Sequence, residues 1–190
     1  MNVAVKKKSP DELLAEVQRL PENMTGEVVD GELYVMGRPS LAHQTAEGEL
    51  ESELRRGGGS GGQRWIIASE LEVLFSTKEL VVPDLVGWRR DRIVGHERDN
   101  PMTVRPDWVC EILSPSTRLK DLGPKRQLYA RHGVPHLWLI DPEAPTLEAF
   151  ELQHERWSLL GTWVEREVVT GVAPFPDFTF DLSKWWLTPA

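Results

Sequence analysis

The chain has 190 residues, 40% of them hydrophobic and 27% charged, with a formal net charge of -8. This length suits one domain with a sizeable core, and the acidic balance argues against a general nucleic-acid coat, which depends on neutralised phosphates. The single cysteine, Cys110, excludes an internal disulfide framework and an all-cysteine metal site.

The start of the chain lacks the apolar core of a signal peptide, and no later run approaches membrane-spanning length. We therefore expect a cytoplasmic protein without a membrane partner. Residues 1–10 are expected to form a flexible terminus, and residues 11–190 a single domain.

The first elements are marked by their caps and turns. Ser9 and Pro10 predict the start of a helix that ends by Pro21. Residues 26–36 predict a hairpin that turns at Asp30-Gly31. A second helix is expected from about Ser40 to Arg56, and its apolar stripe consists of Ala42, Ala46, Leu50 and Leu54. The run 57–62, GGGSGG, predicts a flexible loop, since no phosphate-binding fingerprint accompanies it.

Two apolar, strand-like runs each carry one carboxylate in the middle. Asp84 lies within residues 80–88, and Glu111 lies within residues 106–117. Both faces of both runs are mostly apolar, which is typical of strands inside a sheet, where an ionised carboxylate is costly unless a cation accompanies it. A loop over 89–105 would allow the two runs to be neighbouring strands. Two buried acids placed side by side in this way would need a cation between them. Asp107 competes with Asp84, but its place after Pro106 at a strand start favours a turn role.

Helical spacing follows the second run. Asp121, Lys125 and Tyr129 are spaced to share one face of a helix, and a helix that begins just beyond the strand would lay Lys125 over Glu111. Basic residues gather in the same segment. For any one of them a solvated face is the simpler interpretation, but their clustering beside two carboxylates favours a phosphate-facing surface made of Arg118, Lys120 and Arg126.

The C-terminal third predicts more strands. Residues 136–141 predict a buried strand, and two consecutive hairpins follow through residue 164. The tail over 175–186 is rich in aromatic residues, so it either closes the core or meets a second copy, which leaves a homodimer open.

The order of these residues resembles a known family. The series carrying the resemblance is Pro83-Asp84, Glu111, Ser114, Thr117, Asp121, Lys125, Tyr129, Gly133-Val134-Pro135, Trp138 and Asp141-Pro142. It is similar, over roughly Asp11 to Leu182, to the Uma-type restriction endonucleases, a branch of the PD-(D/E)XK nuclease superfamily. The resemblance implies an α/β (α+β) fold: a mixed sheet forming a restriction endonuclease-like core, an N-terminal helix and hairpin, and added C-terminal strands.

The resemblance also implies an activity and its site. The expected function is a Mg²⁺-dependent endonuclease that hydrolyses phosphodiester bonds in DNA, with Mn²⁺ as a substitute ion. Asp84 and Glu111 are the expected metal ligands, helped by a backbone carbonyl near Ile112. Members of the superfamily usually carry a catalytic lysine two residues after the glutamate, where this chain has Leu113. Lys125, from the following helix, is the candidate here.

Several residues are candidate accessories. Glu47 is either an outer metal ligand or a surface carboxylate, and we favour the surface role. His43 either orients a water or phosphate or packs at the helix border, and Glu72 joins the site only if its face carries Asp84. Asp121 pairs with Lys125 or Arg118, and Tyr129 either bonds a phosphate or packs on the sheet, with packing favoured.

A second function stays open. In it the nuclease fold is catalytically inactive, the carboxylates pair with Lys125 or Arg118 as a structural network, and the domain binds nucleic acid or a protein partner. A metal oxygenase is disfavoured, because the five histidines show no close ligand pairing.

Overall fold

The computed structural model describes residues 8–56 and 64–187. Residues 1–7 of the expected flexible terminus and the glycine-rich run 57–62 lie outside the described residues, so those two predictions stay predictions. The helices are α1 (Pro10–Val17), α2 (Leu41–Arg56), α3 (Arg118–Lys120) and α4 (Arg126–Arg131), with a π-helical turn (Asp121–Lys125) between α3 and α4 and 3-10 turns at Arg90–Ile93 and Leu182–Lys184. The strands are β1 (Thr25–Val29), β2 (Glu32–Met36), β3 (Trp65–Ser69), β4 (Val73–Ser76), β5 (Glu79–Val81), β6 (Leu85–Arg89), β7 (Trp108–Ile112), β8 (His136–Asp141), β9 (Thr146–Gln153), β10 (Arg156–Val164), β11 (Val168–Thr170) and β12 (Thr179–Asp181).

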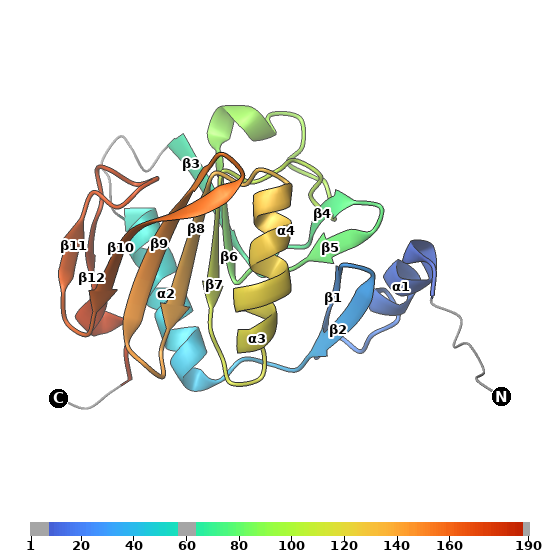
Figure 1. Cartoon of the computed structure of the whole chain (residues 1–190), viewed down its shortest axis with the longest axis horizontal. Coiled ribbons are helices and arrows are strands. Elements are labelled where there is room, and N and C mark those ends of the chain that lie inside the picture. Colours follow the sequence, from blue (N-terminus) through green and yellow to red (C-terminus); the bar gives the residue numbers. More distant parts are fainter. Residues whose placement is uncertain (1–7, 57–63, 188–190) are drawn as a thin grey trace.

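The main sheet is mixed and has helices on both faces, as Figure 1 shows. Its six strands run in the order β10-β9-β8-β7-β6-β3, and β7 pairs with β8 in parallel while the other pairs in this sheet are antiparallel. Alternate residues of β7 therefore enter different cores. Cys110 packs on the side of α2 with Leu50, and Val109 packs on the side of α4 with Leu128. This two-sided cover explains why both faces of the Glu111 run are apolar.

The N-terminal hairpin belongs to a second, smaller sheet, which lies beside the main one (Figure 1). Its order is β2-β1-β5-β4, and α1 packs on it through Leu13 and Val17. The predicted helix start is confirmed, because Ser9 and Glu12 form a reciprocal capping box. The turn at Asp30-Gly31 is also confirmed, with positive φ angles of 52° and 75° that match a tight hairpin turn.

The run 80–88 is not one strand, which corrects the sequence prediction. β5 ends at Val81 in the small sheet, and β6 begins at Leu85 in the main sheet. Pro83 between them has no N–H to donate to a ladder, so the strand breaks there. Asp84 consequently lies on the connector between the two sheets, although β6 and β7 are neighbours as expected, with Leu85 opposite Cys110.

The aromatic tail closes the core. Phe175, Phe178 and Phe180 are buried with Trp185 on the α2 side of the main sheet. Trp138 of β8 contacts two of these rings and donates its indole N–H to the Ala173 carbonyl at 2.8 Å. The predicted hairpins through residue 164 are confirmed by the β8-β9-β10 order. Within the ranges that the structure describes, the helices are too short or too polar to serve as membrane spans.

Candidate active site

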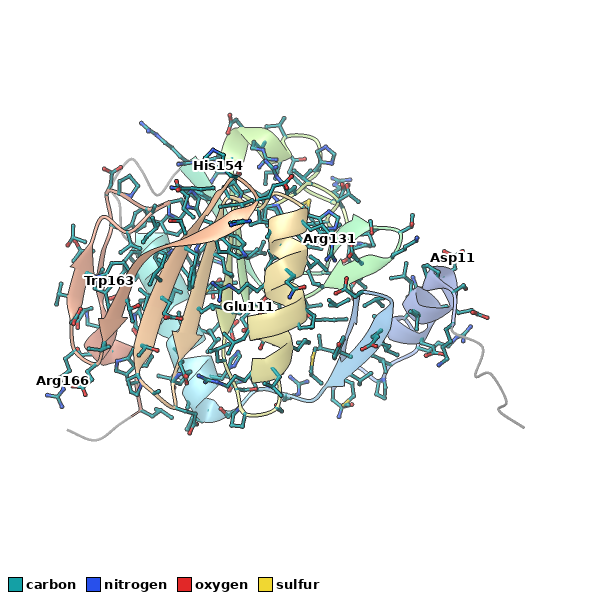
Figure 2. All side chains as sticks on the ribbon, viewed as in Figure 1. Asp11, Glu111, Arg131, His154, Trp163 and Arg166 are labelled. Atoms are coloured by element: carbon teal, nitrogen blue, oxygen red, sulfur yellow. The ribbon has the colours of Figure 1, made fainter. Side chains whose placement is uncertain are left out.

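A cavity of about 340 Å³ opens where the two sheets, α2 and the α3–α4 segment meet. Its lining includes Asp84, Glu111 and Lys125, which the sequence predicts as the central residues of the site. Figure 2 shows Glu111 between the main sheet and the α3–α4 segment. His43 of α2 lines the same cavity. Four separate parts of the chain therefore contribute to one concave site.

Asp84 is held from two sides. Its Oδ2 accepts the Ile112 backbone N–H at 2.6 Å, and its Oδ1 lies 3.1 Å from His43 Nε2. Burial alone would lower the pKa of His43, but the hydrogen bond to Asp84 and the negative charges of Asp84, Glu47 and Asp121 together outweigh burial and raise that pKa. Among the described residues no partner reaches the buried His43 Nδ1. The predicted stripe of α2 thus holds, except that His43 takes the buried place expected for Ala42.

Glu111 is buried and accepts hydrogen bonds on both oxygens. Lys125 Nζ lies 2.8 Å from its carboxylate, and the Tyr129 hydroxyl donates to its Oε1. Burial raises the pKa of Glu111 to about 8; Lys125 opposes this rise, and the nearby carboxylates of Asp121 and Asp84 add to it. Tyr129 therefore bonds as well as packs, whereas packing alone was favoured from the sequence.

Lys125 is buried among carboxylates. Its Nζ lies 2.8 Å from Glu27 as well as from Glu111, and 3.8 Å from Asp121. Burial alone would lower the pKa of Lys125, but Glu111 and Glu27 outweigh it and raise that pKa well above its usual value. The ammonium is consequently a fixed positive charge at neutral pH rather than a base.

The helix that carries Lys125 has an irregular centre. Asp121–Lys125 forms a π-helical turn with Pro124 inside it, and Pro124 has no N–H for the regular helical bond. A π turn follows an i to i+5 pattern, so residues five apart lie near each other. Lys120 and Lys125 both reach Glu27 for this reason. The predicted shared face of Asp121, Lys125 and Tyr129 is confirmed, since all three are buried.

Glu27 of β1 was missed by the sequence reasoning. Its side chain is 0% exposed and it bonds two lysines, Lys120 and Lys125. The available signal was the one used for Asp84 and Glu111, a carboxylate within an apolar strand, here Gly26–Val29. The strand was interpreted only as half of a hairpin. Glu70, which lines the cavity, was also not singled out.

The accessory acids separate into two groups. The surface role favoured for Glu47 is wrong: its side chain is 14% exposed and its Oε2 lies 3.9 Å from His43 Nε2. Burial, and next the charge of Asp84, raise the pKa of Glu47 to about 7. Glu72 does not line the cavity among the described residues. Asp107 does not line the cavity; its carboxylate accepts the Arg89 backbone N–H at 2.8 Å and pairs with Arg92, so it contacts the end of β6 and the following 3-10 turn, and the turn role expected for it stays a prediction.

The three cations expected to face phosphate do not form one surface, which corrects that prediction. Arg118 pairs with Asp141, and the Arg126 guanidinium lies 4.3 Å from the centre of the Phe150 ring. Lys120 lines the cavity but is buried and paired with Glu27. Their charges are taken up by partners within the fold, which sequence proximity does not reveal.

The donor set suits a hard divalent ion. Asp84 and Glu111 offer carboxylate oxygens to one cavity, and Mg²⁺ takes only one or two carboxylates while keeping several waters. Within residues 8–56 and 64–187, no group of three or more His, Cys, Asp or Glu side chains is arranged to hold a metal ion by itself. Any ion here would therefore depend on water, or on phosphate, for the rest of its shell.

Comparison with known proteins decides the family. The model of the family described as "Uma2: Putative restriction endonuclease" matches residues 14–183. The chain belongs to the Uma2 family. A curated relative of the Uma2 chain, the "Uncharacterized protein slr1290" of Synechocystis, is 33% identical over 138 residues, which cover 70% of this chain and 68% of that protein.

A solved structure confirms the fold. The crystal structure of a "putative nuclease belonging to DUF820" from Anabaena variabilis superposes with a TM-score of 0.71 at 22% identity, covering 94% of this chain and 97% of that one. The restriction endonuclease-like α/β architecture expected from the sequence is therefore confirmed.

Proposed function

We propose that this Uma2 chain is a metal-dependent endonuclease that hydrolyses phosphodiester bonds in DNA. The observation that carries the proposal is the convergence of Asp84, Glu111 and Lys125 on one cavity. Membership of a family described as restriction endonucleases supports a nucleic-acid substrate. Asp84 and Glu111 are the proposed ligands of Mg²⁺, with Mn²⁺ as a substitute.

The bound ion would polarise the scissile phosphate and lower the pKa of an attacking water. The residues of the chain have separate tasks around it. Lys125 supplies a fixed positive charge beside the cavity, where it stabilises negative charge that develops on phosphate oxygens. Tyr129 and the Ile112 N–H fix the orientation of the two carboxylates. These contacts leave few rotamers open to the proposed ligands.

Cleavage of supercoiled plasmid and of a structured RNA, with Mg²⁺, Mn²⁺ or EDTA, tests the proposal. Asp84→Asn and Glu111→Gln should each abolish metal-dependent cleavage of DNA. Glu167→Gln changes an exposed carboxylate outside the cavity lining and should cleave as the wild type does. Unchanged cleavage in both site variants would sink the proposal, and cleavage of RNA alone would correct the substrate. A homodimer that cuts both strands stays a prediction for sedimentation analysis.

One observation favours the inactive alternative. Both oxygens of Glu111 already accept bonds from Lys125 and Tyr129, and Leu113 is buried where the superfamily usually carries its lysine. Calorimetric titration of Mn²⁺ and Mg²⁺ into the wild type and Glu111→Gln separates the two functions. Binding that is lost in the variant supports the nuclease. A wild type that neither binds the ions nor cleaves supports a scaffold.

A further inference from the structure

Glu27 contacts two of the segments that present the candidate site, the Asp84 connector and the α3–α4 segment, although it does not line the cavity itself. It belongs to β1, in the centre of the small sheet, where Val28 pairs with Leu80 of β5. Its side chain is 0% exposed, so its charge must be satisfied entirely by neighbouring groups. Those groups are the backbone of the Asp84 connector and two lysines of the α3–α4 segment.

The first contact fixes the connector. Glu27 Oε1 accepts the backbone N–H of Val82 at 2.8 Å. Val82 stands two residues before Asp84, and the intervening Pro83 has no N–H of its own. The connector is therefore anchored at its start by Glu27 and at its end by the bond from Ile112 N–H to Asp84.

The second contact fixes Lys125. The same Oε1 lies 2.8 Å from Lys125 Nζ, and Oε2 pairs with Lys120. Burial alone would raise the pKa of Glu27, but Lys125 and Lys120 outweigh burial and lower that pKa, so Glu27 stays ionised. Lys125 is thus shared between two carboxylates at equal distance, Glu27 and Glu111.

The shared contact of Lys125 becomes important if Glu111 binds a metal ion. If Glu111 is the ligand of a cation in the cavity, Lys125 must give up part of its contact with that carboxylate. Glu27 then still provides an ionised partner within hydrogen-bond distance, while the next acid, Asp121, lies 3.8 Å away. Without Glu27, Lys125 would depend mainly on Glu111 and compete with the ion for it.

We infer that Glu27 is a positioning residue. It holds Lys125 and the Asp84 connector in fixed positions relative to each other, and it frees Glu111 to bind the metal ion. The inference rests on the proposed function. It makes the N-terminal hairpin part of the active site, although the hairpin contributes no metal ligand.

The test is Mn²⁺ calorimetry on the full-length chain, with plasmid cleavage as a second measurement. Glu27→Gln keeps the shape of the side chain and removes its charge. We expect Mn²⁺ affinity and kcat to fall about 10- to 100-fold, the range found for residues that support metal ligands, with little change in KM. Glu27→Gln/Lys125→Met should recover Mn²⁺ affinity, because the competing ammonium is gone, while cleavage stays lost.

Glu79→Gln is the matched control. Glu79 is a buried carboxylate of the same small sheet and pairs with Arg131 and His132, away from the cavity lining. It should lower the melting temperature without changing Mn²⁺ affinity. An equal loss of affinity in this control would show that Glu27 acts through general stability, and would overturn the inference.

The remaining outcomes are also decisive. If the wild type binds Mn²⁺ and cleaves, but Glu27→Gln does both equally well, the inference fails and the proposed function stands. A wild type that neither binds Mn²⁺ nor cleaves the plasmid would overturn both the inference and the proposed function. Should Glu27→Gln fail to fold, Glu27→Gln/Lys120→Met, which removes the second unpaired charge, takes its place; failure of that variant as well would mark Glu27 as purely structural.

Discussion

Two buried carboxylates and one half-buried carboxylate near the cavity differ in pKa because they differ in neighbours. Glu27 contacts two lysines and its pKa is lowered. Glu111 shares a single lysine with Glu27 and its pKa is raised to about 8. Glu47 is 3.9 Å from His43, and its pKa is raised to about 7. Burial raises the pKa of all three acids, and nearby cations oppose that rise most strongly at Glu27, which contacts two lysines.

Glu47 gives a prediction about pH. Its folded pKa, about 7, lies above the ordinary 4.5, so between these values the folded state binds more protons than the unfolded state and stability falls as pH rises. Glu47→Gln should therefore be more stable than the wild type at pH 8, by about 1–2 kcal/mol after allowing for solvent screening, with the difference shrinking toward pH 5. Urea unfolding at both pH values measures it. Glu49→Gln on the same helix is the control, and a difference independent of pH would contradict the prediction.

Lys125 gives a prediction about stability. Lys125→Met leaves Glu111 and Glu27 buried without their shared cation, and should cost about 3–5 kcal/mol of the free energy of unfolding. Combining it with Glu111→Gln should cost less than the two single changes together, since the groups contact each other. Urea titrations of the singles and the double measure this coupling, with the exposed Lys78→Met as control. Strictly additive costs would rule out an energetic pair.

At the scale of single residues, the sequence identifies candidate site residues more reliably than it predicts which partners those residues contact. Asp84, Glu111 and Lys125 could be found because carboxylates in apolar runs and a helical lysine are visible in one dimension. Glu27 showed the same signal, but its lysine partners lie 93 and 98 positions later (120 - 27 and 125 - 27). The burial of Lys120 and the pairing of Arg118 depend on those distant contacts, so a basic cluster was taken for an exposed surface.

The α3–α4 segment shows how one irregular turn serves several contacts. Its π-helical turn lets Lys120 and Lys125 reach one carboxylate, while Lys125 and Tyr129, four apart, reach another. In a regular α-helix, residues five apart point well away from each other. The turn therefore supplies the spacing that joins the small sheet to Glu111.

Single-residue deletions should separate this turn from the regular helix after it. Deleting Gly123 makes Lys120 and Lys125 four apart, which an α-helix also places on one face, so cleavage should stay within about tenfold of the wild type. Deleting the exposed Gln127 rotates Tyr129 by about 100° and should reduce cleavage more than about 100-fold. Plasmid cleavage and circular dichroism of the two variants measure the contrast. Equal losses of cleavage in the two variants would mean that the π-helical turn tolerates a deletion no better than the regular helix does.

Elements were predictable where local chemistry decides them. The Ser9 cap, the Asp30-Gly31 turn and the hairpins after β8 have turn residues and alternation that fix their limits. The break at Pro83 and the π turn were missed, because each is set by the sheet or carboxylate it meets. Pro83 was visible in the sequence, yet the apolar residues around it outweighed it in the interpretation.

Among the described residues, one hydrophobic core lies on each face of the main sheet, and a smaller one lies between α1 and the small sheet. The larger aromatic core lies on the α2 side and contains the C-terminal tail, while the buried carboxylates and lysines lie toward the small sheet. Phe175 is fully buried and its ring centre lies within 5.4 Å of those of Trp65, Trp108 and Trp138. The tail is therefore a stabilising part of the fold, which removes the reason for placing a second copy on it.

Phe175→Ala tests this division. The lost contacts and the cavity left behind should cost about 3–5 kcal/mol of the free energy of unfolding. Because Glu111 and Lys125 lie on the α4 side of the sheet, away from Phe175, cleavage well below the new melting temperature should stay close to that of the wild type. Thermal unfolding and plasmid cleavage measure the two effects; the exposed Leu160→Ala is the control. A large loss of activity at low temperature would show that the two cores are coupled.

Cys110 is the single sulfhydryl of the chain, fully buried in β7 beside Glu111. Burial, and next the charge of Asp84, raise the pKa of this thiol well above its usual value. The folded protein should therefore resist thiol reagents until the centre of the sheet opens. The rate at which a thiol reagent labels Cys110 therefore reports how often the centre of the sheet opens, and no cysteine has to be introduced for the measurement. Metal ions that bind the site should slow that labelling, which gives a way to screen for ligands before a substrate is known.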